Sequence, residues 1–221
     1  ESINAFQKSI AIKEDWNSYR GLGWALLQIG KYAEAIDAFL KSLALYEDWF
    51  SYQGLGWALF NTNQNLESIN AFLKSLALYE DWFSYQGLGW TLFNTNQNLE
   101  SINAFQKSIA IKEDWNSYRG LGWALFHTNK HSEAIDSFSK SIAIKESWNS
   151  YKGLGWALFN TNKHLEAINA FIRSWNMHKD EELLKLILNS INQIYPSDYN
   201  FLLELLRIKK ITFTGNSEIQ L

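Results

Sequence analysis

The sequence contains no cysteine and a single proline, Pro196. Without cysteine the chain forms no disulfide or thiolate metal site, and a cysteine nucleophile is excluded. Its 20 Lys and Arg against 23 Asp and Glu leave a formal net charge of −3, so it lacks the basic surface that binds nucleic acid or an anionic membrane. No apolar run reaches the roughly 18 residues of a membrane-spanning helix, and no stretch resembles a signal peptide. We therefore expect no nucleic-acid or membrane partner, and we expect a cytoplasmic location.

What the sequence does contain is an internal repeat. The segment from Tyr52 to Phe60 recurs in related form from four other tyrosines, Tyr19, Tyr85, Tyr118 and Tyr151. The tryptophans inside these segments are 33 residues apart, and residues 1–26 are identical to residues 100–125. A fixed period between about 20 and 50 residues predicts an array of stacked units, which needs no single large core.

Each unit is predicted to contain two helices. The first helices are expected near residues 16–27, 49–60, 82–93, 115–126 and 148–159, and the second helices near residues 32–46, 65–79, 98–112, 131–145 and 164–178. A residue that suits an N-cap precedes every first helix: Asp15, Asp48, Asp81, Asp114 and Ser147. Apolar residues at helical spacing predict one buried stripe on the second helix of the second unit, made of Leu66, Ile69, Phe72, Leu73 and Leu76.

The array is predicted to cover residues 1–178, as an unpaired second helix at 1–13 followed by five helical hairpins. Because the chain begins inside a repeat, we expect its natural N-terminus to have been removed and the side chains of Ile3, Phe6 and Ile10 to form an exposed apolar stripe. Residues 179–221 are predicted to hold C-terminal capping helices at 181–195 and 198–209 and a short tail. Alternation around a Gly-Asn turn predicts a short hairpin at 211–221, and this segment is either the first strand of a further domain or a tail.

These residues resemble the tetratricopeptide repeat (TPR) family, whose pattern is an aromatic residue, then Leu-Gly three residues on, and later a small residue four positions before Phe. Tyr52, Leu55 and Gly56 match the first half. The second half is matched by Ala35 with Phe39, Ala134 with Phe138, and Ala167 with Phe171. The period is one residue shorter than usual and no Pro closes the repeats, while the ankyrin signature Thr-Pro-Leu-His is absent. The resemblance implies an all-α, right-handed superhelical solenoid of helix-turn-helix repeats with a concave binding groove.

The resemblance also implies that one face of every first helix lines this groove. Four positions follow one another at steps of three and four residues, so that their side chains share a face. The first groove position holds Asn17, Phe50, Phe83, Asn116 and Asn149, and the second holds Arg20, Gln53, Gln86, Arg119 and Lys152. The third holds Trp24, Trp57, Trp90, Trp123 and Trp156, and the fourth holds Gln28, Asn61, Asn94, His127 and Asn160.

The tryptophans at the third groove position have two interpretations. Aromatic faces flanked by amides bind peptide backbone or sugar hydroxyls, which predicts a ligand surface. Alternatively, each indole fills the space beside glycines equivalent to Gly54 and Gly56 and only packs the repeats together. The tryptophans that open the first helices are interpreted as packing between adjacent hairpins: Trp16, Trp49, Trp82, Trp115 and Trp148.

Residue patterns that could perform chemistry are few. His131 and His164 occupy equivalent positions and His127 is close in sequence, but a metal site needs a third ligand of suitable geometry, so we interpret them as solvated turn residues. Pairs such as Glu47-Asp48 are explained by helix capping. We therefore expect no catalytic residue, no metal and no cofactor.

The sequence thus predicts a non-catalytic scaffold that binds an extended peptide or protein segment. Two alternatives remain. The chain is the regulatory or substrate-docking arm of a larger transferase acting on proteins or glycans, or it is a self-assembling repeat module that docks through Ile3, Phe6 and Ile10.

Overall fold

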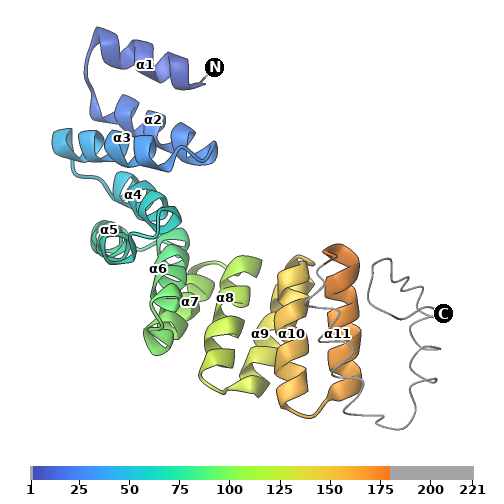
Figure 1. The fold of residues 1–221 in the computed structure, drawn as a ribbon. Coiled ribbons are helices and arrows are strands. Elements are labelled where there is room, and N and C mark those ends of the chain that lie inside the picture. The colour runs from blue at the N-terminus through green and yellow to red at the C-terminus, as the bar shows by residue number, and fades with distance from the viewer. Residues whose placement is uncertain (1, 180–221) are drawn as a thin grey trace. The chain divides into compact units, whose positions relative to one another are not determined.

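The computed structural model describes residues 2–179, and every regular element in that range is an α-helix (Figure 1). The helices are α1 (Ser2–Ile12), α2 (Trp16–Gln28), α3 (Tyr32–Leu45), α4 (Trp49–Asn61), α5 (Asn65–Leu78), α6 (Trp82–Asn94), α7 (Asn98–Ile111), α8 (Trp115–His127), α9 (His131–Ile144), α10 (Trp148–Asn160) and α11 (His164–Met177). The ten helices of the five hairpins are confirmed to within one residue at each end. The predictions for 181–195, 198–209 and 211–221 lie outside the described residues.

The chain divides into two compact units, Glu1–Lys145 and Glu146–Leu221. The first unit contains α1 to α9, and the described part of the second is the hairpin of α10 and α11. Inside the first unit each helix packs against the next one along the chain, and successive first helices (α2, α4, α6 and α8) also contact one another. This neighbour-to-neighbour packing is that of an all-α helical-repeat solenoid.

The predicted N-caps are confirmed. The Asp48 side chain accepts hydrogen bonds from the backbone N–H groups of Phe50 and Ser51 at 3.0 and 3.3 Å. Asp15, Asp81 and Asp114 cap their helices in the same way, and Ser147 accepts one bond from the Ser150 N–H at 3.3 Å. These bonds satisfy amides that have no partner within the helix, which fixes where each first helix begins.

The turn inside each hairpin depends on a left-handed residue. In the first hairpin it is Gly30, with φ of 78°. The other four hairpins use asparagine, Asn63, Asn96, Asn129 and Asn162, with φ between 58° and 60°. Asparagine tolerates this region better than other residues with a side chain, so it ends the first helix and turns the chain into the second.

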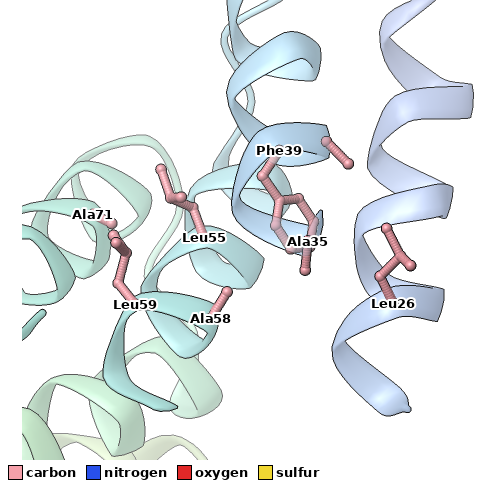
Figure 2. Packing of buried hydrophobic residues seen from close by; sticks show 8 residues of the cluster. Leu26, Ala35, Phe39, Leu55, Ala58, Leu59 and Ala71 are labelled. Carbon is pink, nitrogen blue, oxygen red and sulfur yellow. The ribbon is translucent and has the colours of Figure 1, made fainter. Parts of the chain in front are cut away.

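The core of each repeat is one phenylalanine from the second helix. The Phe39, Phe72, Phe105, Phe138 and Phe171 rings are at most 1% exposed. A Cβ atom added to Gly23 would lie 2.7 Å from the Phe39 ring, and one added to Gly54 would lie 2.2 Å from it. Figure 2 shows Phe39 on α3 among side chains from α2, α4 and α5. The glycines of two successive first helices therefore make room for one shared ring.

The predicted stripe on α5 was partly wrong. Phe72 is buried, but the Leu66 and Leu73 side chains are 70% and 49% exposed. The other buried positions of α5 are small residues, Ser68, Ala71 and Ser75. Because α5 packs against both α4 and α6, its inner positions must be small enough to let both helices approach, and two of the predicted leucines are left outside.

Buried serines connect neighbouring helices by hydrogen bonds. The Ser75 hydroxyl on α5 donates to the Trp49 carbonyl oxygen on α4 at 2.9 Å and shares a 3.0 Å hydrogen bond with Ser84 on α6. Ser42, Ser108, Ser141 and Ser174 make the equivalent bond to the first helix of their own hairpins. Each serine thus satisfies a backbone carbonyl near the start of a first helix.

Helix α1 does not carry the fully exposed stripe that the sequence predicts. Ile3, Phe6 and Ile10 are half-buried. Ile3 packs against the cluster of buried residues around Phe39 that Figure 2 shows, and the Phe6 ring lies where a Cβ atom on Gly21 would be 2.4 Å away. The stripe faces α2, although no residue of α1 is fully buried.

Candidate binding surface

The four groove positions lie on the first helices, on α2, α4, α6 and α8 in the first unit and on α10 in the second. Their burial differs by position. Side chains at the fourth position, Gln28, Asn61, Asn94, His127 and Asn160, are exposed, and the tryptophans at the third are all half-buried. Among the four groove positions, the polar side chains at the fourth are therefore the most open to solvent.

The half-buried tryptophans pack on the core phenylalanines of their own hairpins. Trp57 meets Phe72 edge to face, with ring centroids 5.6 Å apart, and the other four pairs are the same to within 0.3 Å. The space beside the glycines is filled by the phenylalanines and not by the tryptophans. The interpretation that each indole fills this space was therefore wrong. Each indole instead covers the outer edge of a filled core.

The indole faces are partly covered by the following repeat. Trp24 stacks on Phe50 with centroids 4.7 Å apart, and Trp57 stacks on Phe83 at 4.9 Å. Trp90 lies beneath the Arg119 guanidinium at 5.1 Å. The Nε1 atoms of Trp24 and Trp57 are buried and donate no hydrogen bond within the described residues. The first unit therefore presents a stacked row of rings that is neither sealed inside the protein nor fully open.

At the second groove position, side chains bind the N-cap of the next hairpin. Arg20 donates to Asp48 Oδ1 at 3.3 Å. Gln53 Nε2 donates to Asp81 Oδ1 at 2.8 Å and to Ser84 Oγ at 2.9 Å, and Gln86 makes the equivalent bonds to Asp114 and Ser117. Gln53 and Gln86 are only 3% and 2% exposed. Their amides are engaged between repeats and are not displayed to solvent as the sequence predicts.

Arg119 is the least satisfied cation at the second groove position in the first unit. Its guanidinium donates to Asn116 Oδ1 at 2.6 Å and lies 5.1 Å from the Trp90 and Trp115 ring centroids. Its Nε is buried and has no partner among the described residues. Burial lowers the pKa of the Arg119 guanidinium, and the Asp114 carboxylate opposes this shift. Arginine stays protonated in proteins, so this site carries a positive charge held between two indoles.

Side chains at the fourth groove position contact the backbone one turn earlier. Asn61 Nδ2 donates to the Trp57 carbonyl oxygen at 2.8 Å, and Asn160 does the same to Trp156 at 2.9 Å. His127 Nδ1 lies 2.9 Å from the Trp123 carbonyl oxygen. The first-position side chains Phe50, Phe83, Asn116 and Asn149 are half-buried, and Asn17 is exposed. In the second unit, Lys152 and Trp156 are half-buried.

The tryptophans that open the first helices pack within a hairpin. Trp49 contacts Tyr79, which follows α5, with centroids 4.9 Å apart, and Trp16 contacts Tyr46 in the same way at 4.8 Å. The Trp82 and Trp115 rings lie beneath Lys112 and Lys145, and the Trp148 ring stacks on His178. These contacts join the two ends of one hairpin, whereas the sequence predicts contacts between adjacent hairpins.

The sequence predicts that the histidines are solvated. His131 and His164 are instead half-buried first residues of α9 and α11, with rings against Phe126 and Phe159. Among residues 2–179, no three His, Cys, Asp or Glu side chains come together as metal ligands do. In the same range, no helix combines the length and apolar composition needed to cross a lipid bilayer.

The residues that sequence reasoning missed lie between repeats. Ser84 and Ser117, which accept from the glutamines, are fully buried. The available signal was that a serine recurs two residues after each helix-opening tryptophan in all five copies. A polar residue repeated on the inner face of a helix indicates a buried hydrogen bond.

Comparison with known proteins supports the repeat assignment. Models of the tetratricopeptide repeat match residues 16–49 and residues 87–147. No curated protein sequence matches the chain.

Among solved structures, YrrB, described as a TPR protein with an unusual peptide-binding site, is 19% identical with a TM-score of 0.69, covering 85% of this chain and 98% of its own. A chain of the Cut9–Hcn1 complex is 18% identical with a TM-score of 0.74, covering 88% and 40%. MamA from Desulfovibrio magneticus RS-1 is 19% identical with a TM-score of 0.67, covering 74% and 95%. At these identities the likeness concerns the fold. The two matched stretches and the 33-residue helical hairpins show that residues 16–49 and 87–147 are tetratricopeptide repeats.

Proposed function

We propose that this chain is a non-catalytic scaffold that binds an extended peptide segment along the first helices of residues 1–145. The observation that carries the proposal is the register of two positions in four successive hairpins. A half-buried indole is followed four residues later by an exposed polar side chain: Trp24 with Gln28, Trp57 with Asn61, Trp90 with Asn94, and Trp123 with His127. The hairpin of the second unit carries the same pair, Trp156 with Asn160.

This arrangement suits an extended chain for two reasons. Amide side chains supply both a donor and an acceptor, which is what a peptide backbone requires. The indoles are held by edge contacts and stacking, so little side-chain freedom is lost when a ligand lies across them. The peptide-binding site described for YrrB, which shares the fold, is in keeping with such a role.

An array of synthetic peptides of random sequence, probed with the labelled protein, tests the proposal. Peptides that bind are then titrated by fluorescence polarisation against the double variant Asn61→Ala, Asn94→Ala. Because each lost amide contact is worth about 1 kcal/mol, affinity should fall by more than about tenfold. The matched control is Asn70→Ala, Asn103→Ala, which changes two exposed asparagines on α5 and α7. An array without bound peptides, or equal losses in the two variants, contradicts the proposal.

A second candidate function is self-association through α1. The Phe105 ring on α7 is enclosed between Gly89 and Gly120, whereas the equivalent Phe6 ring has, among residues 2–179, a glycine on one side alone, Gly21. The open side of Phe6 and the half-buried Ile3 and Ile10 form an apolar face of the kind that proteins cover by association. Light scattering across a range of protein concentrations tests this, and a strictly monomeric chain rejects it.

A further inference from the structure

A cavity lies at the boundary between the hairpins that contain α4 and α6. At the preceding boundary, between the hairpins that contain α2 and α4, the side chain of Arg20 occupies the equivalent place. The cavity measures about 490 Å³ and lies between α4 and α6 in the first unit. Its wall includes four aromatic rings, Trp49, Tyr79, Trp82 and Phe83, together with the polar side chains of Gln53 and Asp81. Aromatic walls beside a carboxylate favour a cation.

The preceding boundary shows which cation fits. There the Arg20 guanidinium lies 4.7 Å from the Trp16 ring centroid and 5.5 Å from the Phe50 centroid. It also pairs with Asp48 at 3.3 Å. Trp16, Phe50 and Asp48 stand 33 residues before Trp49, Phe83 and Asp81. The same three groups therefore surround a guanidinium at one boundary and a cavity at the next.

Two side chains at the Arg20 guanidinium differ at the next boundary: Arg20 itself, and Asn17, which accepts from Arg20 Nη2 at 2.6 Å and corresponds to Phe50. Position 53, which corresponds to Arg20, is glutamine. Gln53 is shorter and neutral, and its amide reaches only Asp81 Oδ1 and Ser84. Among the residues that the structure describes, no lysine or arginine lies over Trp49 or Phe83. Lys112 lies over the Trp82 ring at 4.0 Å, but the place between Trp49 and Phe83 that corresponds to the Arg20 guanidinium holds no cation of the described residues.

The Asp81 carboxylate lacks a hydrogen-bond donor for one of its two oxygens. The residue is 8% exposed, and its Oδ2 atom is buried and accepts no hydrogen bond from the described residues. At the preceding boundary both oxygens of Asp48 are used, because Ser51 Oγ donates to Oδ2. A buried carboxylate oxygen without a donor is costly, and a guanidinium supplies donors and positive charge together.

We propose that the cavity between α4 and α6 binds the arginine side chain of a partner peptide, with the guanidinium between Trp49 and Phe83 and paired with Asp81. Guanidinium groups stack on aromatic faces and hydrogen-bond to carboxylates at once, which a lysine ammonium does less well. Asp81 is also the N-cap of α6, where the helix dipole disfavours a cation. The Arg20–Asp48 pair shows that the capping carboxylate outweighs this effect. The proposal rests on the peptide-binding function above and names one side chain of the peptide.

The test uses Nα-acetyl-L-arginine amide as the probe and follows isotope-labelled indole N–H signals by NMR. Trp49→Phe and Trp82→Phe assign the two signals of the cavity. The expected result is saturable shifts at these two indoles, with a dissociation constant on the order of 1 mM for so small a ligand. The neutral analogue Nα-acetyl-L-citrulline amide should bind at least about tenfold more weakly, because it lacks the charge.

Three variants make the test specific. Asp81→Asn keeps a side chain that caps helices equally well, so the protein should stay folded while arginine-amide binding falls at least about tenfold. Gln53→Arg places the chain's own guanidinium in the cavity and should block the probe. Arg20→Gln should open the equivalent cavity beside Asp48 and add a second set of shifts at Trp16. Circular dichroism checks the fold of each variant.

Three outcomes overturn the proposal. The arginine and citrulline amides bind equally well, or Nα-acetyl-Nε-trimethyl-L-lysine amide binds more tightly than the arginine amide. The third is that the Gln53→Arg variant binds the arginine amide as well as the parent protein does. If random peptides are captured but arginine amide leaves Trp49 and Trp82 unshifted, the arginine assignment fails and the scaffold function stands. If arginine amide binds and no peptide is captured, the scaffold function fails on its own.

Discussion

At the scale of single residues, the packing of the repeats depends on glycines in the first helices. A phenylalanine ring occupies the space that a side chain at these positions would need. Gly56 and Gly87 enclose the Phe72 ring from α4 and α6, as Gly23 and Gly54 enclose the Phe39 ring. Glycine inside a helix is normally a cost of up to about 1 kcal/mol relative to alanine. The cost is accepted here because it lets two helices approach one phenylalanine.

Helix propensity and side-chain packing therefore predict opposite effects of Gly87→Ala on the free energy of unfolding. Propensity predicts a gain of up to about 1 kcal/mol in the free energy of unfolding. The new Cβ atom, however, would lie 2.2 Å from the Phe72 ring, so we expect a loss of about 2 to 3 kcal/mol in urea unfolding. If the overlap is the cause, Phe72→Leu in the same chain relieves part of the loss in a double-mutant cycle. A stabilised Gly87→Ala variant would show that the ring is not enclosed.

The tyrosines of the first helices give the protein a predictable response to alkaline pH. The Tyr85 hydroxyl donates to Glu80 Oε1 at 2.7 Å, and burial, followed by this hydrogen bond, raises the pKa of Tyr85 to about 12. The pKa values of Tyr19, Tyr52, Tyr118 and Tyr151 are raised as well. An unfolded tyrosine ionises near pH 10, so between about pH 10 and 12 the unfolded chain loses a proton that folded Tyr85 retains.

Stability from Tyr85 is thus complete below about pH 10 and is lost as the pH rises toward 12. Replacing Tyr85 with Phe removes the ionising group, so the fall in unfolding free energy between about pH 9 and 11 should shrink by roughly 1 kcal/mol. Urea unfolding of both proteins at the two pH values measures the difference. The same pH dependence in both would mean that Tyr85 ionises alike in the folded and unfolded chain.

At the scale of helices, one N-cap residue both starts a helix and joins two hairpins. Asp114 Oδ1 accepts from the backbone N–H groups of Asn116 and Ser117, and from Gln86 on the preceding first helix at 2.7 Å. Asp114→Ala removes the cap and the link, so it should lower the free energy of unfolding by about 2 kcal/mol. Asp114→Ser introduces the residue that caps α10 at position 147. Its free energy of unfolding should fall by about 1 kcal/mol less than that of Asp114→Ala. Equal losses by urea unfolding would show that capping contributes nothing here.

Sequence reasoning succeeded for features that depend on neighbours along the chain. The helix bounds and the capping roles of Asp48 and Ser147 follow from local spacing and from residue type. It failed where burial depends on the distance between helices, a distance that periodicity does not contain. Gln53 looked like a displayed amide and is buried against Asp81, while Leu73 looked like core and is half exposed. The cavity beside Asp81 also depends on how α4 and α6 approach each other, and the contacts of Arg20 in the preceding repeat indicate which side chain fits it.

At the scale of the whole molecule, the packing of the first unit predicts that stability adds up repeat by repeat. Contacts in residues 1–145 join helices that are neighbours along the chain, or successive first helices, so each hairpin depends on the adjacent ones. Two fragments of equal length test this. Residues 1–112 and residues 34–145 both start with a glutamate of equivalent position and contain one unpaired second helix and three hairpins.

Both fragments should fold, with helical circular dichroism and a single urea transition. Because the denaturant slope follows the surface exposed on unfolding, each slope should be roughly three quarters of that of residues 1–145, the ratio of the lengths. The midpoints of the two fragments should lie closer to each other than to the higher midpoint of residues 1–145, since the number of interfaces sets them. A single fragment that unfolds far below the other would place a dominant nucleus in the helices it lacks, α1 and α2 for residues 34–145 or α8 and α9 for residues 1–112. The unit would then be one cooperative domain rather than an additive array.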